Sequence, residues 1–155
     1  MSAFPDAETR YLLDTNVLRE LVLGSDKVYD IEARYGLLVA PPRMVWVPYV
    51  VRAELTVLGR NWNNERQANF SRILARFSEI SRFDAAVFDA YVEIDSFSRD
   101  IARVRMGEND LWIAATALVH NFTILTNDRD FSHLAGLDIA VAFVELATAG
   151  VADDR

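Results

Sequence analysis

Short runs of continuously apolar residues, separated by longer stretches with helical periodicity, constrain the fold of this chain more than any other feature. Four of these runs have the character of strands, and none alternates regularly between apolar and polar residues. Strands of this kind are buried on both faces, as in a parallel sheet that helices cover on both sides. We therefore predict an α/β fold, a central parallel β-sheet flanked by α-helices on both faces. The predicted strands are residues 10–13, 44–47, 122–126 and 139–143.

Five helices are predicted between these strands from the spacing of apolar residues and from the residues at their ends. Two of them stop at Gly24 and Gly59, and glycine commonly ends helices. Residues 26–39 receive no assignment. The predicted helices are residues 17–23, 49–58, 65–80, 85–101 and 110–119.

The length of 155 residues is that of one ordinary domain, with enough chain to bury a core. We place this domain at residues 10–148, after an N-terminal extension at residues 1–9 and before a C-terminal tail at residues 149–155. No apolar stretch approaches the ~20 residues of a membrane span, and the first residues do not have the layout of a signal peptide. A cytoplasmic protein that does not enter a membrane is therefore expected.

The chain contains no cysteine and only two histidines, which limits its chemistry. Disulfides, thiolate zinc sites and a cysteine nucleophile are excluded. His120 and His133 are too few for an imidazole cage. Any bound metal ion must therefore be held by oxygen ligands.

The formal net charge of −7 argues against a protein that binds nucleic acid through a general basic field. It does not exclude a local basic groove, and it also suits a basic protein partner. Lys27 is the only lysine, so nearly all of the positive charge is carried by arginine, which can bind phosphate through two hydrogen bonds.

Two aspartates come at the ends of predicted strands. Asp14 directly follows the strand at residues 10–13, and Asp128 comes two residues after the strand at residues 122–126. In an open parallel sheet, ligands bind outside the carboxyl ends of the strands. Aspartate is also common at helix caps and turns, so for each residue taken singly the structural explanation is equally good.

Glu54 lies in the apolar stripe of the predicted helix at residues 49–58, where an unpaired charge would be costly. Two explanations stay open at this point: a buried ion pair with an arginine, or binding of a metal ion. The apolar residues of the stripe are Val51, Leu55 and Leu58, and the candidate ion-pair partners are Arg52 and Arg10.

Asp110 begins the predicted helix at residues 110–119 on its apolar side. An aspartate in the first turn of a helix interacts well with the helix dipole and can act as a cap. That explanation accounts for the position of Asp110 but not for its orientation toward the core. The other residues of this helical face are Ile113, Ala114, Ala117 and Leu118.

Four acids at one end of a sheet repel one another unless a cation neutralises them. Oxygen ligands without cysteine or histidine select Mg²⁺ or Mn²⁺. Such sites bind phosphate substrates, because the metal polarises a phosphoryl oxygen and activates water. On these residues alone, hydrolysis of a phosphodiester is the leading prediction. The four predicted metal-binding and catalytic acids are Asp14, Glu54, Asp110 and Asp128.

Four motifs in the order Leu-Asp-Thr-Asn at residues 13–16, Arg-Ala-Glu-Leu at 52–55, Glu-Asn-Asp-Leu-Trp-Ile-Ala-Ala-Thr-Ala at 108–117 and Leu-Thr-Asn-Asp-Arg-Asp-Phe at 125–131 span most of the chain. Together they resemble the PIN-domain family, and within it the VapC-type toxins of bacterial toxin–antitoxin pairs. The resemblance implies a small α/β domain with an acidic Mg²⁺ or Mn²⁺ site that cuts RNA as an endoribonuclease. It also implies an antitoxin partner. Together with the apolar helical hairpin around residues 49–80, it suggests a homodimer.

The family's acids correspond to the four named above. We expect Asp14, Asp110 and Asp128 to hold one or two metal ions and Glu54 to orient or deprotonate the attacking water. Asn16 and Thr126 resemble polar residues that support the acids, although they could equally be cap and turn residues.

Four arginines lie close in sequence to the third and fourth acids and are candidate contacts for RNA. Each could equally belong to a solvated charged surface. They are Arg99, Arg103, Arg105 and Arg129.

Two other classes of protein compete with this reading. Aspartyl-phosphate enzymes and phospho-receivers also place an aspartate after the first strand, but they need a second aspartate where this chain has Asn16, and a suitably placed lysine where it has only Lys27. The other alternative is a catalytically silent PIN-like binding or regulatory module. Such a module would bind a metal ion and a protein partner without turning over RNA.

Overall fold

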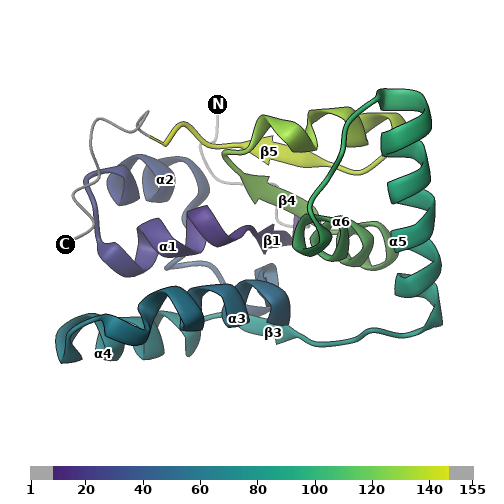
Figure 1. The fold of residues 1–155 in the computed structure, drawn as a ribbon. Helices are drawn as coiled ribbons and strands as arrows, with labels where there is room; N and C mark the ends of the chain where they lie inside the picture. Colours follow the sequence, from purple (N-terminus) through teal and green to yellow (C-terminus); the bar gives the residue numbers. More distant parts are fainter. Residues whose placement is uncertain (1–8, 147–155) are drawn as a thin grey trace.

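A computed structural model describes residues 9–146 and shows one β-sheet surrounded by helices (Figure 1). All strand pairs are parallel, and the strand order is β3-β2-β1-β4-β5. The predicted fold class is confirmed. Most of the predicted N-terminal extension, and the whole predicted C-terminal tail, lie outside the described residues. The strands are β1 (Tyr11–Leu13), β2 (Val45–Pro48), β3 (Ser78–Ile80), β4 (Thr123–Thr126) and β5 (Val141–Phe143).

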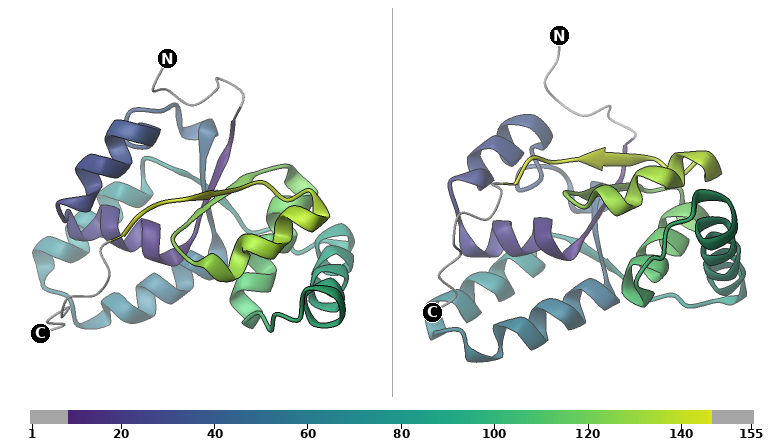
Figure 2. Two further views of the ribbon diagram at one scale, coloured as in Figure 1. Left: turned by 90° about the horizontal axis from the view of Figure 1, so that it is seen from above. Right: turned by 45° about the horizontal axis from the view of Figure 1, so that its top comes forward.

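Helices flank the sheet on both faces (Figure 2). In Figure 1, α5 and α6 pack against each other on the right, and α1, α2 and α4 lie on the left. None of the helices between residues 9 and 146 is long and apolar enough to cross a membrane. The helices are α1 (Thr15–Leu23), α2 (Lys27–Tyr35), α3 (Tyr49–Leu58), α4 (Asn64–Leu74), α5 (Ala85–Phe97) and α6 (Glu108–His120). The remaining helical segments are the 3₁₀ helices η1 (Pro42–Met44), η2 (Gly59–Asn61) and η4 (Arg129–Leu137) and the π-helical turn η3 (Ser98–Ala102).

The central strands are buried, and apolar residues make up all of β1 and the middle of β4. Leu12 and Leu13 of β1 are fully buried, as are Ile124 and Leu125 of β4. Leu13 pairs with Leu125, and the backbone N–H of the next residue, Asp14, donates to the Leu125 carbonyl at 3.0 Å. The core therefore fixes the ends of these two strands against each other.

Most predicted elements agree with the structure to within two residues, but the predicted helix at residues 65–80 is wrong in its last part. The helix α4 ends at Leu74, and residues 78–80 form the edge strand β3 beside β2. Phe70, Ile73 and Phe77 are all buried, so the apolar spacing is kept across the turn. A three-residue edge strand carries no apolar run that would distinguish it from the end of a helix.

Two further stretches differ from the prediction. Residues 26–39, which had no assignment, contain α2, whose buried residues are only Ile31 and Tyr35. The predicted helix at residues 85–101 is the α-helix α5 as far as Phe97 and continues as the π-helical turn η3.

Candidate active site

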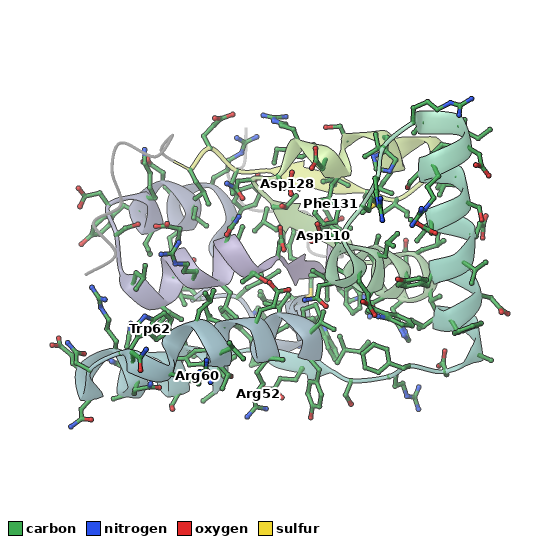
Figure 3. All side chains as sticks on the ribbon, in the orientation of Figure 1. Arg52, Arg60, Trp62, Asp110, Asp128 and Phe131 are labelled. Carbon is green, nitrogen blue, oxygen red and sulfur yellow. The ribbon has the colours of Figure 1, made fainter. Side chains whose placement is uncertain are left out.

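The four predicted acids lie at the carboxyl edge of the sheet. Asp14 follows β1 and Asp128 follows β4, and these two strands are parallel neighbours. Asp110 comes from the first turn of α6 and Glu54 from α3. Their charges act on one another, since the other three acids each raise the pKa of Asp110. Figure 3 shows Asp110 and Asp128 close together in the middle of the view.

Asp14 is buried, with 6% of its surface exposed. Its Oδ1 accepts a hydrogen bond from the Thr15 backbone N–H at 2.7 Å, and its Oδ2 accepts one from the Thr126 hydroxyl at 2.6 Å. Burial raises the pKa of Asp14, these two hydrogen bonds lower it, and the charges of Asp128 and Glu54 raise it again. The net effect is a pKa above the ordinary value, so the carboxylate is costly to keep ionised without a cation.

The Thr126 hydroxyl connects the two strand ends. It is fully buried, and besides donating to the first aspartate it accepts a hydrogen bond from the Asp128 backbone N–H at 3.0 Å. Asp128 caps η4 by accepting from the Asp130 N–H at 2.8 Å. On the exposed side, the Asn16 side-chain amide donates to Asn127 Oδ1 at 3.0 Å. Cap and turn bonds therefore coexist with the gathering of the acids.

Within residues 9–146, Glu54 forms no ion pair with either candidate arginine. Its Oε1 accepts a hydrogen bond from the side-chain amide of Asn109 at 2.9 Å. Arg52 instead pairs with Glu79 at 2.7 Å, and Arg10 donates to a backbone carbonyl. The glutamate is thus held from the first turn of α6, next to Asp110.

The predicted apolar stripe of α3 is correct only in part. Val51 and Leu55 are fully buried, and Glu54 between them is half-buried. Leu58, which was expected on the same core face, is 58% exposed because the last turn of the helix extends past the core. Glu54 therefore lies at the border of the core, open to the site.

The pKa of Asp110 is the most strongly shifted in the site. Burial first, and then the charges of Asp14, Asp128, Glu54 and Asp130, raise the pKa of Asp110 to about 7. The helix it belongs to is capped at Gly107. A carboxyl group with this pKa exchanges its proton near neutral pH, or loses it when a cation neutralises the surrounding charge.

The donor set suits a hard divalent cation, because every acidic side chain offers oxygen and no thiol or imidazole joins them. The acids do not, however, form a ready-made cage. Among residues 9–146, no three or more acidic, histidine or cysteine side chains are grouped so that they could hold a metal ion. They are close enough to perturb each other's protonation, and Asp14 and Asp110 have raised pKa values that a cation would relieve.

The four candidate arginines are all exposed, but they divide into two pairs. Arg99 Nε donates to Asp95 Oδ1 at 2.8 Å, and Arg129 pairs with Glu145 at 3.2 Å. The other two arginines have no ion pair or side-chain hydrogen bond within the described part of the chain. These two are Arg103 and Arg105.

Asn109 and Gly107 belong to the site but were not singled out from the sequence. Asn109 stands inside the third motif, and its neighbour Asp110 was the signal that could have pointed to it. Gly107 lies against Asp110, since a Cβ at Gly107 would be 3.8 Å from Asp110 Oδ2. Only the folded backbone shows this approach.

The fold and the site define an α/β protein with a cluster of acids at the carboxyl edge of a five-stranded parallel sheet. The sequence model of the PIN domain matches residues 11–137. The chain belongs to the PIN domain family, as the four motifs predicted.

A curated relative is similar to about half of this chain. A protein named Ribonuclease VapC4, from Mycobacterium tuberculosis (strain ATCC 25618 / H37Rv), is 34% identical over 74 residues, which are 48% of this chain. The match spans 55% of that relative, little more than half of its length.

Solved structures share the fold over nearly their whole length. VapBC2 from Rickettsia felis, bound to a DNA fragment from their promoter, has a TM-score of 0.68 at 22% identity, covering 87% of this chain and 98% of that chain. VapBC-5 from Mycobacterium tuberculosis, described as a member of the VapBC family of toxin-antitoxin systems, has a TM-score of 0.59 at 20% identity. That match covers 89% of this chain and 99% of the other.

Proposed function

We propose that this protein is a metal-dependent endoribonuclease that hydrolyses RNA phosphodiester bonds. The observation that carries the proposal is the gathering of four acids at the carboxyl edge of a PIN domain, with the pKa of Asp110 raised to about 7. Such a shift, caused by burial and by neighbouring acids at the opening of a sheet, is typical of functional sites. The name of the relative from M. tuberculosis supports ribonuclease activity.

In the proposed mechanism, Asp14, Asp110 and Asp128 would hold one or two Mg²⁺ or Mn²⁺ ions. When bound, such an ion would supply polarisation of a phosphoryl oxygen and a lowered pKa for water. Glu54, held at Oε1 by Asn109, would orient the attacking water and accept its proton. The water oxygen would form the new bond to phosphorus as the bond to the opposite ester oxygen breaks, and that oxygen would leave with a proton from solvent. The Thr126 hydroxyl keeps the Asp14 carboxylate in place, and Asn16 ties the two strand ends together through Asn127.

The biological role that we propose is the toxin of a toxin–antitoxin pair. The likeness to VapBC structures supports an antitoxin as protein partner, and the net charge of −7 suits a basic partner segment. We further propose a homodimer working in the cytoplasm. Purification with the gene neighbours co-expressed, followed by light scattering, would measure both the partner and the mass of the assembly.

The test is cleavage of total cellular RNA by the purified protein with Mg²⁺ or Mn²⁺, read by mapping the ends of the fragments. We expect cuts that disappear with EDTA and in the nearly isosteric variant Asp110→Asn. Asp138→Asn is the matched control, because it removes the same charge from an exposed position outside the site. Cutting by Asp110→Asn at the wild-type rate would overturn the site assignment.

A second candidate function is a catalytically silent module that binds metal and a protein partner. The observation in its favour is the likeness to VapBC toxin-antitoxin structures, which supports a protein partner independently of any RNA turnover. Titration calorimetry with Mn²⁺, combined with the RNA cleavage assay, separates the two functions. Metal binding without any RNA turnover would favour the silent module.

A further inference from the structure

The segment between η3 and α6, residues 103–107, is here named the arginine loop, and its first end is anchored by a buried serine. Ser98, in the π-helical turn, is fully buried, and its hydroxyl donates to Met106 Sδ at 3.5 Å. The same oxygen lies 2.7 Å from His133 Nε2. The anchor therefore joins η3, η4 and the loop.

Ring packing strengthens the contact between η3 and η4. The Phe97 ring stacks on His133 with the centroids 6.4 Å apart and the planes 11° apart. It also covers Gly136 so closely that a Cβ there would lie 2.7 Å from Phe97 Cζ. Since η4 is capped by Asp128, the start of the arginine loop is fixed to the element that begins at one of the acids.

The other end of the loop reaches the site directly. Gly107 is the cap of α6, and a Cβ placed on it would be in van der Waals contact with the Asp110 carboxylate, at 3.8 Å from Oδ2. The arginine loop therefore follows η3, which contacts η4 after Asp128, and continues into α6, which carries Asp110, at its end. Arg105 stands two residues before Gly107, so the C-terminal part of the loop approaches the acid on α6.

The loop exposes its two arginines and buries the residues that follow them. Arg103 and Arg105 are exposed, Val104 is half-buried and Met106 is 6% exposed. Arg103 has φ of 58°, a left-handed conformation that is uncommon for a residue other than glycine. Arg103 ends η3 in this conformation, and its backbone N–H donates to the Ser98 carbonyl, which fixes the start of the loop.

The two loop arginines also differ from the other exposed arginines near the site. Arg99 forms an ion pair with Asp95, and Arg129 forms one with Glu145. The Arg129 guanidinium carbon also lies 4.3 Å from the centre of the Phe143 ring. Arg103 and Arg105 make no such contact in the described part of the chain. Their guanidinium groups are therefore available to a ligand without breaking an ion pair.

An acidic site in a protein of net charge −7 repels a phosphodiester, so a substrate needs cations beside the acids. We propose that the arginine loop binds the backbone phosphates of single-stranded RNA next to the scissile bond, through Arg103 and Arg105. This rests on the proposed nuclease function and assigns substrate binding to one preformed element. Arg99 and Arg129 do not take part.

The test is fluorescence anisotropy with a labelled, single-stranded oligouridine in EDTA, over a series of salt concentrations. Each phosphate contact contributes about 0.7 to the slope of log affinity against log salt for single strands. We expect Arg103→Gln/Arg105→Gln to lower the slope by about twice that amount and to weaken binding about tenfold or more at low salt. Arg103→Lys/Arg105→Lys keeps the charge and should keep the slope.

The matched control is Arg99→Gln/Arg129→Gln, which changes the net charge equally and should leave the slope unchanged. Urea unfolding of all three double variants reports whether the fold is retained. An equal loss in the control, or a wild-type slope in Arg103→Gln/Arg105→Gln, would overturn the proposal.

The binding and cleavage assays test the two proposals separately. RNA binding through the arginine loop without any cutting would contradict the nuclease function and leave the present inference standing. If the wild type cuts RNA and the Arg103 and Arg105 variants bind RNA normally, the nuclease function stands and the present inference is contradicted. Wild-type protein that neither binds nor cuts RNA would contradict both.

Discussion

At the scale of single residues, the Thr126 hydroxyl holds together the two aspartates at the strand ends. It donates to Asp14 Oδ2 and accepts from the Asp128 N–H, and it is fully buried. Thr126→Val keeps the shape of the side chain but leaves both partners without their hydrogen bond. Asp14 is buried, and a buried group left in this state costs about 1–3 kcal/mol, whereas Asp128 is only half-buried and adds little.

We therefore expect Thr126→Val to lower the free energy of unfolding by about 1–3 kcal/mol. Because the threonine orients a proposed metal ligand, cleavage should fall about 10- to 100-fold. Urea unfolding and end-labelled RNA cleavage measure the two effects. Thr126→Ser retains the hydroxyl and should restore most of the activity, so an equally inactive serine variant would count against this role.

Asp110 gives the protein an unusual dependence of stability on pH. Burial and neighbouring acids raise the pKa of Asp110 to about 7 in the folded protein, whereas an unfolded chain has a pKa of about 3.9. Between these values the folded protein holds a proton that the unfolded chain has released. The free energy of unfolding should therefore decrease as the pH rises from about 4 to about 7, the opposite of a salt-bridged aspartate.

We expect metal-free protein to melt at a higher temperature at about pH 5.5 than at about pH 8. Asp110→Asn, which stays neutral, should be more stable than the wild type at the higher pH and show a flatter profile. Calorimetry in EDTA measures both. A wild-type melting temperature that rises steadily over this range would contradict the raised pKa.

The positions of the acids at the strand ends could be predicted from the sequence, but the hydrogen-bond and ion-pair partners of the site residues could not. Asp14 and Asp128 could be predicted because any residue directly after a central parallel strand reaches the ligand-binding edge. The partner of Glu54 could not, since Asn109 lies 55 positions away in the chain and only the packing of α3 on α6 joins them. The pairing of Arg52 with Glu79 depended likewise on β3, a strand that the apolar pattern does not mark.

At the scale of elements, Gly136 sets the distance between η4 and the end of α5. A Cβ there would meet Phe97 Cζ at 2.7 Å, so the ring must leave its stack on His133. We expect Gly136→Ala to lower the free energy of unfolding by about 1–3 kcal/mol, as overpacking does. Urea unfolding measures this loss.

A double-variant cycle shows whether the contact is responsible. Phe97→Leu removes the clashing ring edge, so Gly136→Ala should cost much less in the Phe97→Leu background than in the wild type. Purely additive costs would show that the ring contact is not the cause.

The elements that sequence analysis missed share one property, namely a weak apolar signal. The helix α2 buries only Ile31 and Tyr35, and the edge strand β3 has no fully buried residue. By contrast, α3 and α6 have well-marked apolar faces and ends, and both were predicted nearly to the residue. Edge elements carry little hydrophobic patterning, so their type is decided by the neighbours that they pack against.

At the scale of the whole molecule, metal binding and folding should be linked. A ligand that binds only the folded state stabilises it by about 2.7 kcal/mol at a hundred times its dissociation constant. We expect Mn²⁺ to raise the melting temperature at about pH 8, where Asp110 is ionised, and to have a smaller effect at about pH 5.5, where protons compete. Differential scanning fluorimetry measures the shifts, with Asp14→Asn as the variant that should lose them.

The matched comparison is Asp138→Asn, at an exposed position away from the site. A shift of equal size in Asp14→Asn and in the wild type would place the metal elsewhere.

The overall architecture was predictable because unbroken apolar runs leave few alternatives to a covered parallel sheet. The strand order was not, since nothing in the runs themselves shows that β1 lies between β2 and β4. That order places the first and the fourth acid beside each other.

The same strand order has a consequence for the newly made chain. Parallel neighbours need long crossovers, and the β1–β4 pair joins segments more than a hundred residues apart, such as Leu13 and Leu125. In the proposed function, no fragment that ends before β4 contains a complete catalytic centre. During translation, the nascent chain would therefore be unable to cut the messenger RNA or the ribosomal RNA. Cleavage would become possible only after almost the whole domain has emerged and β4 has paired with β1.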